Sequence, residues 1–225
     1  MAVTQAKSVS EAVAARFSTR AFLDRPVPGS LVRDILERAA RAPSGGNLQP
    51  WRVHALSGEP LAAFKKRVAS SPLESPEYEV YPPQLWEPFR TRRFVCGEDL
   101  YAAIGIPRED RPARLVQLAK NAGFFGAAVG VFFSIDRKLG PPQWADLGMY
   151  MQTVMLLAVE RGLDTCPQEF WARYPRAVAA FVDLPDDHMV FSGMALGWRD
   201  PDHPINAWRT RRDDFDLWCE MKGFD

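Results

Sequence analysis

The sequence contains few cysteines and histidines, which limits the chemistry that its side chains can perform. There are three of each among 225 residues, and Cys96, Cys166 and Cys219 form neither a Cys-x-x-Cys pair nor a metal-binding pattern with histidine. We therefore expect reduced thiols that serve packing, and no metal site.

The sequence also lacks an excess of charge, a long apolar run and a secretory signal. Lys and Arg together number 28, as do Asp and Glu, and this balance argues against nucleic-acid binding, which rests on net positive charge. The longest uncharged stretches, residues 121–135 and 147–159, are shorter than the roughly 18 apolar residues of a membrane span. Residues 1–13 contain no apolar core of a signal peptide. We expect a cytoplasmic protein that binds neither nucleic acid nor membrane.

Motifs of several common enzyme classes are missing as well. There is no Gly-x-Ser-x-Gly elbow of hydrolases and no phosphate-binding P-loop. Gly123, Gly126 and Gly130 do not have the Gly-x-Gly-x-x-Gly spacing of a dinucleotide-binding fold. No catalytic pair of nucleophile and base is expected.

The hydrophobic pattern predicts many helices and few strands. Ser30 is the expected N-cap of the second helix, with Asp34–Arg38 and Glu37–Arg41 as ion pairs at i,i+4 spacing. Because the strands do not alternate regularly with helices, we expect an α+β fold in one domain, residues 1–225. The expected elements are helices over 8–15, 31–41, 61–69, 112–126, 143–161, 176–182 and 215–221, strands over 51–56, 129–135 and 189–196, and a turn over 164–167.

Arg16, Ser18 and Arg20 lie in a segment too short and irregular to form a helix face. In an extended chain alternate residues project to one side, so these three side chains would point together. Two guanidinium groups and a hydroxyl suit an anionic cofactor, because the arginine fork matches phosphate oxygens. A solvated basic turn is the alternative for this segment.

Two further loops carry small or basic residues. Ser44-Gly45-Gly46-Asn47 is a stretch in which glycine lets a ligand approach the backbone, although an ordinary turn has the same composition. Arg209, Arg211 and Arg212 cluster near the C-terminus, where a solvated charged face is the alternative to an anion site.

Taken together and in order, these segments resemble the nitroreductase family over about residues 10–220, and the insertion described below resembles the branch that includes nitrobenzoate-reductase-like enzymes. The motifs that carry the resemblance are Arg16-Phe17-Ser18-Thr19-Arg20, Ala42 to Trp51, Thr165-Cys166-Pro167-Gln168-Glu169, Gly193-Met194-Ala195-Leu196-Gly197-Trp198, and the tail from Pro204-Ile205-Asn206 to Arg212.

The resemblance implies a central, mostly antiparallel sheet surrounded by helices, in an intertwined homodimer with two FMN sites at its interface. One subunit would bind the flavin through Arg16, Phe17, Ser18 and Arg20, with Arg16 and Ser18 at the phosphate and Arg20 near N1 and O2 of the ring. The other subunit would close over the ring through Pro43, Ser44, Gly45 and Asn47.

The remaining cofactor-binding residues implied by the resemblance come from later in the chain. Pro167, Gln168 and Glu169 would flank the ring, Arg209 and Arg212 would bind the phosphate with Arg211 as the alternative, and Asn121 is carried over weakly. The sequence departs from the family where Phe170 replaces a frequent glycine, and where no basic residue follows Asn121 at the usual position.

The implied function is electron transfer from NADH or NADPH, through FMN, to nitroaromatic or quinone-like acceptors by a ping-pong mechanism. No side chain would act as a catalytic acid, base or nucleophile, and Arg20 would stabilise negative charge on the reduced ring. The alternatives are a specialised flavin enzyme on the same fold, such as a dehalogenase or a flavin-fragmenting enzyme, a flavin-binding protein without turnover and, more distantly, a non-enzymatic interaction module.

Residues 72–96 hold five of the 19 prolines together with several aromatic residues. We call residues 72–112 the insertion, and we expect it to be irregular and to act as a substrate lid. Its aromatic residues Tyr78, Tyr81, Trp86 and Phe89, with Arg90, Arg92 and Arg93, would favour aromatic and carboxylated acceptors. The equally weighted alternative is that the arginines are solvated and only the aromatic residues pack.

Overall fold

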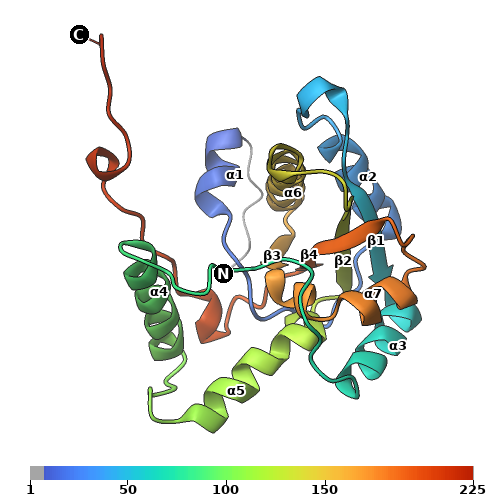
Figure 1. The fold of residues 1–225 in the computed structure, drawn as a ribbon. Helices are drawn as coiled ribbons and strands as arrows, with labels where there is room; N and C mark the ends of the chain where they lie inside the picture. Colours follow the sequence, from blue (N-terminus) through green and yellow to red (C-terminus); the bar gives the residue numbers. More distant parts are fainter. Residues whose placement is uncertain (1–7, 225) are drawn as a thin grey trace.

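A four-stranded antiparallel sheet lies at the centre of the protein (Figure 1). The computed structural model describes residues 8–224, so most of the segment searched for a signal peptide lies outside the described residues. The sheet order is β1-β2-β4-β3, which leaves β1 and β3 at its two edges. The α+β expectation is confirmed, with strands β1 (Arg52–Ser57), β2 (Val129–Asp136), β3 (Asp164–Gln168) and β4 (His188–Gly197).

Helices cover both faces of this sheet because its central strand β2 is apolar on both sides. Val131 and Phe133 face one layer, formed by α2 (Gly29–Ala39) and α6 (Pro141–Glu160). Phe132 faces the other layer, which includes α3 (Gly58–Ala69) and α7 (Pro175–Phe181). The inward face expected for the long helix is confirmed, because Leu147, Tyr150, Met151, Val154, Met155 and Ala158 are all buried in α6.

The insertion contains more regular structure than its prolines and aromatic residues indicate. After an irregular stretch it forms α4 (Phe89–Ala103), which was not expected, and α5 (Arg111–Ala119) begins at its end. None of the residues of α4 is fully buried, and Figure 1 shows α4 and α5 standing away from the sheet. Because α4 has no buried face, its position depends on contacts that its exposed side chains make.

Two details expected for the second helix are wrong. The helix begins at Gly29 with Pro28 as its N-cap residue, so Ser30 already lies inside it. Asp34 pairs with Arg38 as expected, but Glu37 pairs with Arg33. The helix ends at Ala39, which places Arg41 beyond the regular i,i+4 geometry.

Three other expectations also need correction. The helix expected over 112–126 ends at Ala119, and a 3-10 segment, η2 (Lys120–Gly126), follows with Phe124 and Phe125 at positive φ. The turn expected over 164–167 is strand β3, formed by pairing with β4. In place of a helix over 215–221 there is one short turn, η5 (Phe215–Leu217). Trp218 packs edge-on against Phe215, but both it and Leu217 stay largely exposed, and a short helix is not stable without tertiary packing. No helix within residues 8–224 is long and apolar enough to cross a membrane.

Candidate functional site

The segment from Arg16 to Arg20, which we call the basic segment, leaves α1 (Val9–Ala15) and runs beside the edge strand β3. Ser18 forms a parallel bridge with Thr165, whose carbonyl accepts the Thr19 N–H at 3.0 Å. Phe17 and Thr19 are buried, whereas Arg16, Ser18 and Arg20 are partly exposed. The segment is therefore extended, and alternate residues present two basic groups and a hydroxyl on its open side.

The C-terminal tail, residues 204–224, reaches the basic segment. The Arg209 guanidinium lies 3.5 Å from the centre of the Phe17 ring. Burial, and secondarily the charge of Arg212, lower the pKa of Arg16. Arg16, Arg20, Arg209 and Arg212 make no ion pair with any residue in 8–224. The buried Asp164 carboxylate acts on Arg209 and offsets part of the positive charge. The charge that remains suits a bound dianion such as a terminal phosphate.

Arg211 differs from its neighbours because its guanidinium is already paired. It lies 3.2 Å from the Asp99 carboxylate on α4. Arg212, by contrast, lies near enough to Arg16 to affect its pKa. Arg211 is therefore held against α4, whereas the charge of Arg212 acts on Arg16.

Asn206 joins the tail to the basic segment, a role that its position in the sequence does not reveal. Its side-chain oxygen accepts the Arg20 N–H at 3.0 Å, and its amide donates to the carbonyls of Ala21 and Asp200 at 2.8 Å each. The Asn206 carbonyl also accepts from Arg209 at 2.7 Å. Asn206 is buried, so it holds Arg20 and Arg209 on the same side of the fold.

The end of β3 brings Pro167, Gln168 and Glu169 next to this cluster. Gln168 is buried, and its amide nitrogen donates to the backbone and side-chain oxygens of Asn121 at 2.9 and 3.1 Å. Its side-chain oxygen accepts the Trp171 indole N–H at 3.2 Å. The side chains of Gln168 and Asn121 therefore fix the backbone where β3 ends and a 3-10 turn, η3 (Glu169–Arg173), begins. The Glu169 side chain is exposed on this turn.

Cys166 precedes this turn and faces the fold interior. Burial raises the pKa of its thiol to about 11, against the opposing influence of Arg20 and a hydrogen bond with Ser18. The thiol is therefore neutral near pH 7 and poorly suited to nucleophilic chemistry. All three cysteines are free, and residues 8–224 contain no cluster of three or more His, Cys, Asp and Glu side chains suited to a metal ion.

The loop at Pro43 to Asn47, which we call the glycine loop, lies elsewhere in the same chain. It forms a short 3-10 turn, η1 (Gly45–Asn47), in which Gly46 and Asn47 have φ near 59° and 57°. The Gly45 N–H donates to the carboxylate of buried Asp146 at 3.1 Å. Ser44 accepts the Gln49 N–H at 3.0 Å, and this internal bonding leaves the outer side of the loop open.

The two candidate segments are held at opposite ends of α6. Asp146, near the start of the helix, anchors the glycine loop. Ala12, four residues before Arg16, packs against Val159 near the helix end. At a rise of about 1.5 Å per residue, these anchor points are roughly 20 Å apart. One chain therefore does not bring the two segments together, as Figure 1 also shows.

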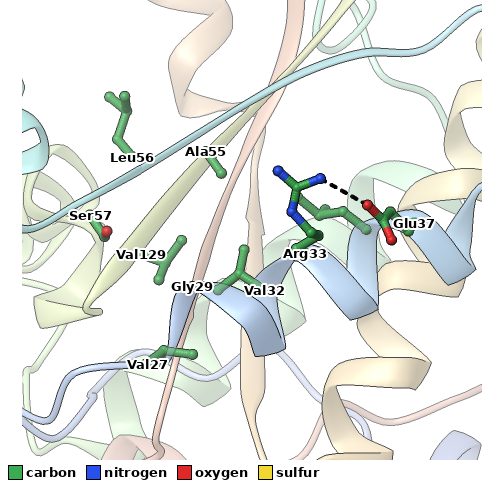
Figure 2. Close-up of a pocket in the computed structure, with 10 residues that line it drawn as sticks. Val27, Gly29, Val32, Arg33, Glu37, Ala55, Leu56, Ser57 and Val129 are labelled. Carbon is green, nitrogen blue, oxygen red and sulfur yellow. Dashed lines mark hydrogen bonds and ion pairs between the residues drawn. The ribbon is translucent and has the colours of Figure 1, made fainter.

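Of two hollows in the protein, one touches the predicted site and the other does not. A pocket of about 340 Å³ is lined by Arg20, Lys120 and His203 among others. A second hollow, of about 380 Å³, lies between α2 and the edge strand β1 (Figure 2). It is lined by Val32, Leu56 and the Arg33–Glu37 pair, among other residues, and by none of the predicted cofactor-binding residues.

The chain is similar to known proteins over most of its length. The profile described as the nitroreductase family matches residues 13–198. The chain is 38% identical over 210 residues to a nitrobenzene nitroreductase of Ectopseudomonas oleovorans, covering 88% of this chain and 89% of the relative. It is 37% identical over 216 residues to a 4-nitrobenzoate reductase of Pseudomonas putida, covering 95% of each.

A solved structure is similar over nearly the whole chain. It is the FMN and NADPH-dependent nitroreductase NfnB from Sphigopyxis sp. strain HMH, with 47% identity and a TM-score of 0.92. The similarity covers 96% of this chain and 100% of that one. The family profile's range contains both the basic segment and the glycine loop.

Proposed function

Because this chain belongs to the nitroreductase family, we propose that it is an FMN-dependent oxidoreductase that transfers electrons from NADPH or NADH to nitroaromatic acceptors. The observation that carries the proposal is the unpaired basic cluster of Arg16, Arg20, Arg209 and Arg212 beside the end of β3. The 47% identical relative is FMN- and NADPH-dependent, and the two curated relatives are named for nitrobenzene and 4-nitrobenzoate.

Different residues of the cluster would contact different parts of the cofactor. Arg16, Ser18, Arg209 and Arg212 would bind the phosphate, and Phe17 supports Arg209 through its ring. Arg20 would stabilise negative charge on the ring, where a fixed guanidinium acts as that charge develops. When bound, FMN supplies the hydride-transfer chemistry. The buried thiol of Cys166 takes no part, because its raised pKa keeps it neutral.

A second copy of the chain would complete each site. The glycine loop and the basic segment are too far apart in one chain to contact the same flavin ring, so we assign Pro43, Ser44, Gly45 and Asn47 to the flavin of the partner. Exposed apolar side chains in the tail, among them Leu217, Trp218 and Phe224, have exposed fractions of 72%, 65% and 73%. The open edge of β1 and the hollow beside it (Figure 2) offer a surface for such a tail.

Among Arg90, Arg92 and Arg93 of the insertion, Arg93 is the best candidate to bind an anionic acceptor. Arg90 pairs with Glu87 at 2.6 Å, and Arg92 pairs with Asp213. Arg93 lies over the Tyr81 ring and makes no ion pair within residues 8–224. A carboxylated acceptor such as 4-nitrobenzoate should therefore react with a lower KM than uncharged nitrobenzene. Equal KM values would refute this preference without affecting the flavin assignment.

The visible spectrum of the purified protein tests the main proposal. The protein should be yellow, release FMN on denaturation, and lose its flavin absorbance when NADPH or NADH is added under anaerobic conditions. Adding nitrobenzene should then restore the absorbance. Release of FAD, no uptake of added FMN, or a bound flavin that neither nucleotide reduces would overturn it.

A further inference from the structure

Asp164, the first residue of β3, carries a carboxylate that is almost completely buried, with only 5% of its side chain exposed. It forms an ion pair with Arg199, whose Nε atom lies 3.5 Å from the Asp164 Oδ2 atom. Arg199 follows the end of β4 by two residues, and its backbone is fixed by an antiparallel bridge to Phe22. The basic segment runs beside β3 here, with Ser18 bridged to Thr165. The ion pair therefore lies next to the basic segment.

Two guanidinium groups share the ring of Phe17 in that segment. The guanidinium carbon of Arg199 lies 5.2 Å from the ring centre, and that of Arg209 lies 3.5 Å from it. Arg209 also donates to the carbonyls of Asn206 and Trp208 at 2.7 and 2.9 Å, both times through Nη1. Because a guanidinium has several N–H donors, Arg209 retains others for a ligand.

The carboxylate of Asp164 offsets the repulsion between these two like charges. Burial lowers the pKa of Arg209, the charge of Arg199 lowers it further, and the charge of Asp164 raises it. Burial raises the pKa of Asp164, and the charges of both arginines oppose that shift. The three charges therefore act on one another, with the single negative charge beside the two positive ones.

The ion pair is poorly suited to stabilise the fold by itself. Its distance of 3.5 Å exceeds the length of about 2.7–2.9 Å that is usual for a charge-assisted bond. Within residues 8–224, neither Asp164 Oδ2 nor Arg199 Nε has a hydrogen-bond partner. Removal of a carboxylate from water is unfavourable, and a pair without hydrogen bonds recovers only part of that free energy. The location of the pair beside Arg209 points instead to a role in ordering the basic cluster.

We propose that Asp164 is a positioning residue for the flavin phosphate: it neutralises Arg199, so that Arg209 stays over the Phe17 ring with donors directed to the ligand. The inference rests on the proposed function, because it concerns the phosphate of that same flavin. Without the carboxylate, Arg199 would repel Arg209, and Arg209 is exposed enough to turn into solvent. FMN binding would then have to restore its position.

The test compares FMN with riboflavin, which has the same ring and no phosphate. The dissociation constant of each flavin is measured with the full-length protein after flavin removal. Asp164→Asn keeps the size of the side chain and removes its charge. It should raise the Kd for FMN about fivefold, as expected for one partly exposed charge contact, and leave the Kd for riboflavin unchanged.

The partner residue supplies the second half of a double-mutant cycle. Arg199→Gln leaves the carboxylate free to attract Arg209 away from the phosphate, so it should also raise the Kd for FMN. The double variant, Asp164→Asn with Arg199→Gln, removes both charges and should return the Kd for FMN toward the parent value. If one single variant does not fold, the other and the double variant carry the same comparison.

A matched control and the affinities of the parent separate this inference from the proposed function. Asp34→Asn removes a carboxylate that pairs with Arg38 and Arg161, and it should leave both dissociation constants unchanged. A parent protein that binds FMN no more tightly than riboflavin would contradict the proposed phosphate site itself. If the parent prefers FMN, three results would overturn the role of Asp164: undiminished FMN affinity in Asp164→Asn, equal losses for both flavins, or a double variant no better than the single ones.

Discussion

Arg20 is held in place by the fold, while its charge stays available for the proposed ligand. Its backbone N–H is bound by Asn206 at 3.0 Å, and one guanidinium nitrogen donates to the Ser18 carbonyl at 3.1 Å. These two contacts fix the position of the Arg20 side chain. Its guanidinium makes no ion pair within residues 8–224. Its position is thus fixed by the protein, while its charge is available to an anion.

Replacement of Arg20 tests that division at the residue scale. Arg20→Ala should raise the Kd for FMN by roughly ten- to a hundredfold, since one charge-assisted contact contributes about 1.5–3 kcal/mol. Flavin reduction by NADPH should slow more in Arg20→Ala than in Arg20→Lys, because lysine keeps the charge and loses only the fork. Flavin titration and stopped-flow reduction measure both effects. An alanine variant with the affinity and rate of the parent would show that Arg20 is not a flavin ligand.

At the scale of elements, the turn after β3 is supported from behind by a packed aromatic group. Trp171 is fully buried, stacks on Phe124 at 4.7 Å and donates its indole N–H to Gln168. Gly193 on β4 makes room for the indole, because a Cβ at this position would lie 2.9 Å from the Trp171 Nε1 atom. The support of the turn therefore depends on a glycine in the neighbouring strand.

Gly193→Ala should accordingly destabilise the protein by about 1–3 kcal/mol, the usual cost of overpacking. It should also weaken FMN binding, because a displaced Trp171 no longer holds Gln168. Gly97→Ala is the matched control, since a methyl group there meets open space in α4 and should be neutral or slightly stabilising. Chemical denaturation and flavin titration compare the two. Equal stability of both variants would refute the packing argument.

The sequence predicted the elements whose pattern is local and missed those formed by distant contacts. Strand β2 and helix α6 carry their hydrophobic pattern within one segment, so their positions were predicted closely. Strand β3 contains Asp164 and Pro167 and resembles a turn, and only its pairing with β4 makes it a strand. Helix α4 follows five prolines in a segment without buried residues, so neither propensity nor hydrophobic pattern indicated it.

The same distinction applies to the candidate site. The alternation at Arg16, Ser18 and Arg20 could be predicted because it depends only on an extended chain. The supporting residues could not, because Asn206 contacts Arg20, and Asp146 contacts Gly45, across more than one hundred residues of sequence. A polar residue that supports a distant segment has no local pattern that distinguishes it from a surface residue.

At the scale of the whole molecule, the C-terminal tail is the part that one chain leaves unexplained. It extends away from the sheet (Figure 1) and exposes apolar side chains that would ordinarily be buried. We expect a second copy to cover them. The double substitution Leu217→Ser with Trp218→Ser should then weaken the dimer at least tenfold, since burying each side chain contributes about 1.5–3 kcal/mol.

Sedimentation velocity over a range of concentrations measures that change. Asp216→Asn, in the same turn, is the control and should leave the association unchanged. Flavin content should fall together with the dimer fraction, because each proposed site needs both chains. A double-serine variant that associates like the parent would show that the tail is not part of the interface.

A mixed dimer tests the composite site most directly. One chain would carry Arg16→Ala with Arg20→Ala, and the other, with a different tag, Gly45→Trp with Asn47→Ala. Both homodimers should be nearly inactive. In the mixed dimer both lesions fall in one site and leave the other intact, so about half of the parent activity per dimer should return if the sites are independent. An inactive mixed dimer would show that both segments serve a site within one chain, and it would contradict the shared flavin site.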